Sequence, residues 1–239
     1  MYDLDDHTIY RAVGLLRRHG PQTVSRWSEL IAEYGITDPV RAAELAETGD
    51  DPITCRLADG RVGVVDALAE GRVLTHRLSV AEIAADVLDA GPDLEIFLHL
   101  EERSPGIELV FPATGAAVLA ERGIDDPRWR PEVGLLLEPG ALSGRHPGDL
   151  IGVRASWGAL FLETVDAEEV SAPADLPARL AATIGLGSRQ ILDEVVWQVM
   201  ADDPAAFTDP APPLTELLAA ADLQLSGSFV THPGLDFSS

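Results

Sequence analysis

Apolar residues at helical spacing predict three short helices at the start of the chain. The first covers residues 8–19. The second is expected to begin with Ser25 as its cap and to stop at Gly35. Asp38 is the expected cap of the third helix, with Pro39 in its first turn. All three are amphipathic and need a common core to bury their apolar faces.

A β-hairpin is predicted directly after these helices. Residues 53–57 and 62–64 alternate between apolar and polar side chains, and Asp59-Gly60 between them is typical of a hairpin turn. Three short helices followed by a hairpin is the element order of a winged helix. Residues 5–72 therefore resemble the winged helix-turn-helix class, and that resemblance implies a module often used to contact nucleic acid.

The next part of the chain predicts alternating strands and helices. Ser79 and Glu82 form a capping-box pattern, which predicts a helix that continues through Leu88. Strands are predicted at Val73–Leu78, Asp93–Leu100 and Ile107–Phe111, and a further helix near Ala116–Arg122.

A second recognisable order of elements lies between Val133 and Val165. Predicted strands at Val133–Leu137, Leu150–Arg154 and Ala159–Val165 are separated by turns that contain Gly148-Asp149 and Gly158. This order resembles one half of a swapped-hairpin barrel of the AbrB type. The resemblance implies a small barrel-like β segment.

The last part of the chain is predicted to be helical. Residues 166–176 are acidic and contain proline, as in a linker. Helices are predicted at Leu176–Ile184, Ser188–Met200 and Leu214–Ala221. The tail from Gly227 to Ser239 is expected to add no core-forming element.

These predictions give an α+β protein with three parts. Residues 1–72 are the winged-helix-like domain, residues 73–168 a mixed α/β unit with the barrel-like segment, and residues 169–239 a helical segment with a tail. The motifs at Gly71–Leu78, Pro147–Leu150 and Pro213–Leu218 are similar to N-terminal regions of uncharacterised bacterial proteins. Such proteins often continue into further modules, so the resemblance implies a fragment of a longer polypeptide.

Charge separates the winged-helix-like part from the rest. The chain has 40 acidic and 17 basic residues, all of them arginine, and a formal charge of −23. Residues 1–78 hold 9 Arg and 13 Asp or Glu, a net charge of −4, whereas residues 79–239 hold 8 and 27, a net charge of −19. The acidic N-terminus and the lack of a long apolar run predict a cytoplasmic protein outside the membrane.

Nucleic-acid binding is considered because arginines occur where a winged helix would contact phosphates. The candidates are Arg17, Arg18, Arg26, Arg41 and Arg61. Around Arg41, however, the expected recognition helix carries glutamates and no Asn or Gln to contact bases. Nucleic acid is therefore a disfavoured partner.

No motif predicts a catalytic, metal or cofactor site. Cys55 is the single cysteine and alternates with apolar residues, which indicates packing. The six histidines show no metal-ligand spacing. His76 and Arg77, at a strand-to-helix junction, are the pocket candidates, although a structural hydrogen bond at His76 is the favoured interpretation.

The hypothesis from the sequence is a non-catalytic interaction or regulatory protein. Its winged helix would serve protein docking, and its acidic surface would face a basic protein partner or another copy in a homo-oligomer. One alternative is a DNA-binding transcription regulator that uses residues 5–72. The other is an enzyme with a site near His76 and Arg77.

Overall fold

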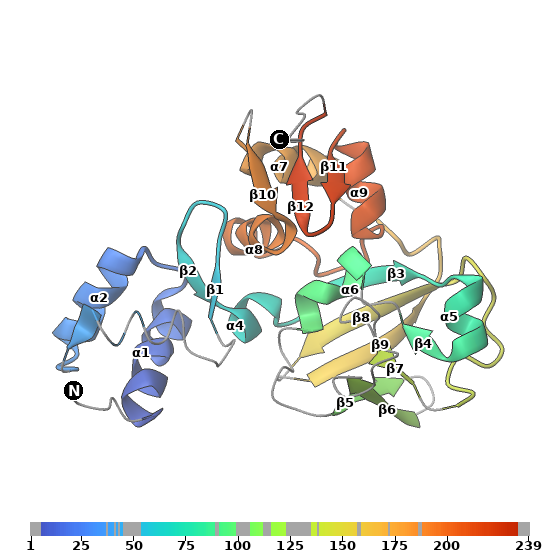
Figure 1. The fold of residues 1–239 in the computed structure, drawn as a ribbon, viewed down its shortest axis with the longest axis horizontal. Coiled ribbons are helices and arrows are strands. Elements are labelled where there is room, and N and C mark those ends of the chain that lie inside the picture. Colours follow the sequence, from blue (N-terminus) through green and yellow to red (C-terminus); the bar gives the residue numbers. More distant parts are fainter. Residues whose placement is uncertain are drawn as a thin grey trace.

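The computed structural model mixes helices and strands, which confirms the α+β class. Figure 1 shows helices α1 and α2 at one end of the molecule, a large sheet at the other, and the C-terminal helices above both. The structure describes residues 6–36, 38–40, 42, 44, 54–88, 91–98, 106–111, 116–122, 135–137, 139–156, 159–171, 173–185 and 188–233.

Helices α1 (Asp6–His19) and α2 (Val24–Glu33) lie close to their predicted positions. The cap of α2 is Thr23, and the prediction of Ser25 was wrong. The Thr23 hydroxyl accepts a hydrogen bond from the backbone N–H of Arg26 at 3.2 Å, from an extended backbone conformation that suits a cap.

The third predicted helix is described only in part. Pro39, Val40, Ala42 and Glu44 are helical, whereas Arg41 lies outside the described residues. The helices share a small core with the hairpin. Its buried members are Ala12, Val13, Leu15, Leu16, Trp27, Leu30, Ile31, Ile36, Ala42, Val62 and Val64.

The predicted hairpin is confirmed as β1 (Thr54–Arg56) and β2 (Val62–Val64), which pair antiparallel. Its two faces belong to different cores. Val62 and Val64 pack with the N-terminal helices, and Leu57 packs in a larger core that includes the C-terminal helices. Helix α4 (Val65–Ala69) continues from β2 into that larger core.

A seven-stranded sheet forms the middle of the protein. The strand order is β3-β8-β9-β5-β6-β7-β4, and all neighbours are antiparallel except β5 and β9. The strands predicted near 73–78, 107–111, 150–154 and 159–165 are confirmed within it. The members are β3 (Val73–Arg77), β4 (Val87–Leu88), β5 (Gly106–Phe111), β6 (Ala116–Arg122), β7 (Leu135–Leu136), β8 (Leu150–Ser156) and β9 (Ala159–Val165).

Two segments have the opposite structure to the predicted one. In the segment predicted as a strand at 93–100, residues 93–98 belong to helix α6 (Gly91–Leu98), where Pro92 in the first turn is pre-organised for a helix, and residues 99–100 lie outside the described residues. The helix predicted at 116–122 is strand β6, which pairs with β5 from Ala116 to Glu121. Hydrogen bonds from a neighbouring strand outweigh the helix propensity of a short alanine-containing segment.

Two predicted helices begin or end elsewhere. Helix α5 (Val80–Ala85) stops before Leu88, because Asp86 has a left-handed backbone with φ of 50° and the next residues form β4. Helix α8 begins at Leu192 and not at Ser188, because β10 (Arg189–Ile191) pairs with β12.

The tail prediction was wrong as well. Strands β11 (Gln224–Ser226) and β12 (Phe229–Thr231) complete a three-stranded sheet with β10, and Val230 is fully buried. Alternation over only three residues is too short to distinguish such a strand from a loop.

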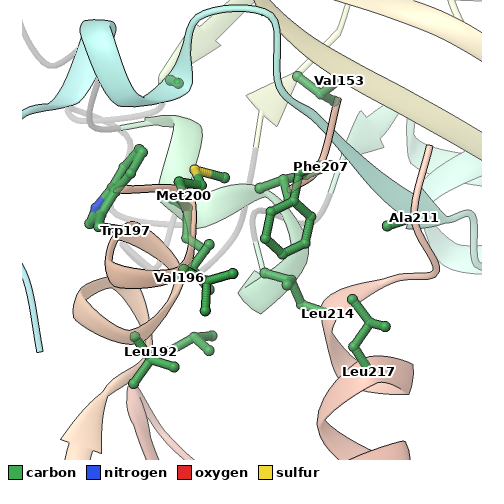
Figure 2. Packing of buried hydrophobic residues seen from close by; sticks show 14 of the residues in the cluster. Val153, Leu192, Val196, Trp197, Met200, Phe207, Ala211, Leu214 and Leu217 are labelled. Carbon is green, nitrogen blue, oxygen red and sulfur yellow. The ribbon is translucent and has the colours of Figure 1, made fainter. Parts of the chain in front are cut away.

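Helices α7 (Leu176–Thr183), α8 (Leu192–Asp202) and α9 (Leu214–Ala220) carry the C-terminal part of the larger core. Figure 2 shows Val196 of α8 and Leu214 of α9 on either side of the buried Phe207 ring, with Val153 of β8 nearby. The same core contains Leu57 of the hairpin. One continuous core therefore takes residues from all three predicted parts of the chain.

A buried arginine connects the sheet to the C-terminal helices. Arg72, just before β3, is 6% exposed, and burial lowers its pKa. Its Nε donates to the Leu68 carbonyl at 3.2 Å and its Nη2 to the Met200 carbonyl at 3.2 Å. Its Nη1 donates to the carbonyls of Pro204 and Ala206. The guanidinium thus satisfies backbone acceptors at the end of α8 and in the loop that follows.

We expect Arg72→Met to lower the free energy of unfolding by about 3 kcal/mol or more, because it leaves buried carbonyls without donors. Urea unfolding followed by circular dichroism measures the loss. Arg77→Met is the matched control: Arg77 makes an exposed ion pair with Glu216, and such pairs are worth less than about 1 kcal/mol. Equal losses in the two variants would contradict the structural role of Arg72.

Candidate functional site

His76 lies between two buried carboxylates. Its Nε2 is 2.6 Å from Glu82 Oε1 on α5, and its Nδ1 is 3.3 Å from Asp93 Oδ2 on α6. Glu82 Oε2 accepts a hydrogen bond from the Ser79 N–H at 2.7 Å, which completes the predicted capping box. Asp93 Oδ1 accepts one from the N–H of Thr215 on α9 at 3.3 Å. The three side chains join β3 to three helices.

The two carboxylates keep His76 protonated. Burial alone would lower the pKa of the imidazole, but the hydrogen bonds to Asp93 and Glu82 and their negative charges outweigh it and raise the pKa from 6.5 to about 9. At neutral pH the ring is therefore an imidazolium that donates both of its N–H groups.

This arrangement favours a structural role for His76. An imidazolium with both nitrogens hydrogen-bonded to carboxylates has no lone pair to act as a base or a nucleophile. Arg77 points elsewhere: its guanidinium pairs with Glu216 at 2.8 Å and donates to the Gly148 carbonyl at 3.0 Å. The two pocket candidates from the sequence are therefore not brought together around one cavity.

Most of the arginines suggested for nucleic acid are held by carboxylates of the same chain. Arg17 pairs with Asp66 of α4 at 2.6 Å, and Arg26 pairs with Glu29 at 2.9 Å and with Glu33 at 3.1 Å. Ion pairs of this kind lower the positive charge that is open to a phosphate.

Arg61 and Arg18 complete this set. Arg61 Nε is 2.6 Å from Asp59 Oδ2, and its Nη2 is 2.7 Å from Asp202 Oδ1 on α8. The guanidinium of Arg18, in contrast, lies over the ring of Tyr34, with its Cζ 6.0 Å from the ring centroid. Among the described residues, Arg18 thus differs from Arg17, Arg26 and Arg61 in having an aromatic ring, and no carboxylate within ion-pair distance, as its neighbour.

A hollow of about 740 Å³ lies between the hairpin turn and helices α7 and α8. This volume is in the usual range of ligand pockets. Three aspartates and one arginine give its wall a net negative charge. The lining residues are Ala58, Asp59, Arg179, Ala182, Thr183, Gln198, Val199, Asp202 and Asp203.

Hydrogen bonds lower the pKa of two carboxylates of this hollow, Asp59 and Asp203. The backbone N–H of Ala205, followed by the guanidinium of Arg179, lowers the pKa of Asp203. Partial burial would raise the pKa of Asp59, but hydrogen bonds from the backbone and side chain of Arg61 lower it. The hollow therefore offers fixed negative charge beside the apolar side chains of Ala182 and Val199.

Cys55 behaves as its sequence position predicts. It packs against the larger core, and burial raises the pKa of its thiol to about 12. A thiol with this pKa is neutral at physiological pH and is not a nucleophile.

Asp93 and Asp202 matter most among the residues that the sequence interpretation missed. Asp93 was assigned to a strand, although Pro92 before it is a helix-start signal. Asp202 is one of two adjacent aspartates, and nothing in its local sequence indicates that it pairs with Arg61, which lies 141 positions away.

Comparison with known proteins gives no family for this chain. No family model matches it, and no curated protein or solved structure is significantly similar. Within the described residues, no group of three or more His, Cys, Asp or Glu side chains could hold a metal ion. No helix in the same part of the chain is long and apolar enough to cross a membrane.

The His76 cluster predicts a stability that falls at alkaline pH. The pKa of His76 is higher in the folded protein than its ordinary 6.5, so its stabilisation is complete below pH 6.5 and is lost as the pH rises through about 9. We expect a loss of about 2–3 kcal/mol over this range. Urea unfolding between these pH values measures it.

Two variants test the assignment of this pH dependence. His76→Gln should remove it, and His146→Gln, at a histidine that is exposed, should retain it. If His76→Gln does not fold, the ring-proton NMR signal of His76 in the unaltered protein should titrate near pH 9. A titration near 6.5 would show that the carboxylates do not hold the proton.

Proposed function

We propose that this protein is a non-catalytic interaction protein with a regulatory role, and that its winged-helix-like segment serves protein docking. The observation that carries the proposal is the position of the hairpin turn. Residues 58–61, which would form the tip of a wing, are hydrogen-bonded to helix α8 of the same chain.

Three contacts hold the turn on α8. The N–H of Ala58 donates to the Glu194 carbonyl at 3.2 Å, and the N–H of Asp59 donates to Gln198 Oε1 at 3.2 Å. Arg61 adds its ion pair with Asp202. A wing that contacts DNA has to present its turn to the phosphate backbone. Here the turn instead contacts α8 of the same chain. This contact supports a use of the segment in protein contacts and not in DNA binding.

The charge of the hollow supports a basic partner. The aspartates at the hollow pair with arginines of the chain, but among the described residues Asp59, Asp202, Asp203 and the neighbouring Asp175 share only Arg61 and Arg179, so negative charge remains in excess. Complementary charge increases the rate and the specificity of association. A basic side chain with an aliphatic stem could place its charge near Asp202 and Asp203 and its stem on Val199. We therefore propose the hollow as the docking site for a basic protein segment.

The two alternatives have less support. A DNA-binding regulator would rely on Arg17, Arg26 and Arg61, which are neutralised within the chain. An enzyme centred on His76 would need a free ring nitrogen and a cavity that reaches it.

Ala182→Arg tests the hollow, because Ala182 is exposed on its wall and a guanidinium there would repel a basic ligand. We expect the affinity for a fluorescein-labelled nona-arginine peptide, measured by anisotropy near physiological salt, to fall by about fivefold or more. The control is Ala84→Arg, which makes the same charge change at an exposed position of α5. An equal loss in both variants would show only a general charge effect and would refute the hollow as the site.

DNA binding has a separate test. We expect no retention of the protein on immobilised duplex DNA even at about 50 mM salt, where phosphate contacts are strong. Retention that is lost in Arg17→Ala, Arg18→Ala and Arg61→Ala would instead establish the transcription-regulator alternative.

A further inference from the structure

Two arginines and a histidine of α1 gather around one exposed tyrosine. Tyr34, at the end of α2, is 43% exposed. Arg18 lies over its ring, and the His19 ring meets it edge-on with centroids 6.3 Å apart. Arg11 Nη2 is 3.5 Å from the Tyr34 carbonyl oxygen. We call Arg11, Arg18, His19 and Tyr34 the tyrosine–arginine surface.

The arginines of this surface differ from their neighbours. Arg17 on the same helix and Arg26 on α2 are paired with carboxylates, whereas Arg11 and Arg18 have none within ion-pair distance in the part of the chain that the structure describes. They are seven residues apart on α1, and two helical turns place them on one face. In a chain with a formal charge of −23, these two exposed guanidiniums thus lie on one face of α1 without an anionic partner among the described residues.

We infer that the tyrosine–arginine surface binds a short acidic segment of a partner protein. A guanidinium binds a carboxylate through two parallel hydrogen bonds, so Arg11 and Arg18 can each bind one acidic side chain. Tyr34 supplies an exposed ring against which an apolar residue of the segment can pack. Tyrosine and arginine are also the residue types that most often carry the binding energy of protein interfaces.

The surroundings favour a short segment over a nucleic-acid strand. A strand brings a continuous row of phosphates, and its affinity grows with the number of phosphates that are neutralised. Helix α2, which ends at Tyr34, adds no unpaired cation to such a row, because its arginine, Arg26, is paired with Glu29 and Glu33. Two carboxylates on a short segment match the two available guanidiniums.

This site is independent of the proposed docking hollow. Figure 1 shows α1 and α2 at one end of the molecule, away from α7 and α8, which line the hollow. The two surfaces have opposite charge and would take opposite partners. The failure of either assignment therefore leaves the other one standing.

The test is a selection from a phage-displayed library of random dodecapeptides on the full chain, compared with Arg11→Ala combined with Arg18→Ala. The control combines Ala84→Glu with Ala219→Glu, which makes the same change in net charge at exposed helical positions far from α1. We expect the unaltered and control proteins to enrich peptides with at least two acidic residues and one apolar residue. A synthetic peptide from that set should bind the double-arginine variant at least about tenfold more weakly.

Each other outcome overturns the inference. Selected peptides without acidic residues, or equal affinity for the double-arginine variant and the unaltered protein, would show that Arg11 and Arg18 do not form a carboxylate site. A fluorescent single-stranded dT12 that binds more tightly than the peptides, and is lost in the same variant, would assign the surface to nucleic acid.

Discussion

The guanidinium of Arg72 holds the protein together because it satisfies carbonyls that the core would otherwise leave without donors. Met200, Pro204 and Ala206 belong to the end of α8 and to the loop behind it, where no strand or helix supplies an N–H. The loop then follows β3, with the Val73 N–H donating to the Phe207 carbonyl at 2.6 Å. With α8 fixed on the sheet in this way, the hairpin has a surface to dock on. Both the hollow and the orientation of the N-terminal helices depend on that arrangement.

The position of the hairpin decides which arginines of the N-terminal part form ion pairs. Because its turn lies on α8, Arg61 becomes a link to Asp202, and because α4 follows directly, Arg17 becomes a link to Asp66. These arginines are used within the fold. Arg11 and Arg18 are exposed on α1 and have no carboxylate within ion-pair distance among the described residues. The described part of this acidic chain thus presents an acidic hollow and a small basic surface, a combination that fits a protein with two different binding partners.

Local sequence was enough to predict an element correctly where its signal acts over a few residues. The capping box at Ser79 and Glu82, the Asp59-Gly60 turn and the strand at Val73–Arg77 all follow from contacts within one element. The errors at residues 93–98 and 116–122 occur where short alternating segments suit either structure. There the choice depends on a distant neighbour: Thr215 and His76 for Asp93, and strand β5 for β6.

By itself the sequence determined the α+β class, the uneven charge, the packing role of Cys55 and the structural interpretation of His76. Only the tertiary structure decided which carboxylates hydrogen-bond to His76 and which arginines are neutralised by ion pairs. It also decided that the hairpin turn contacts α8. The reason is physical. Helix caps, turns and amphipathic periods depend on neighbours in the chain. The ion pairs of Arg17 with Asp66 and of Arg61 with Asp202, in contrast, join positions 49 and 141 residues apart, and the buried His76 cluster reaches Thr215, 122 positions after Asp93. Whether residues so far apart in the sequence meet in space is decided by how the core packs.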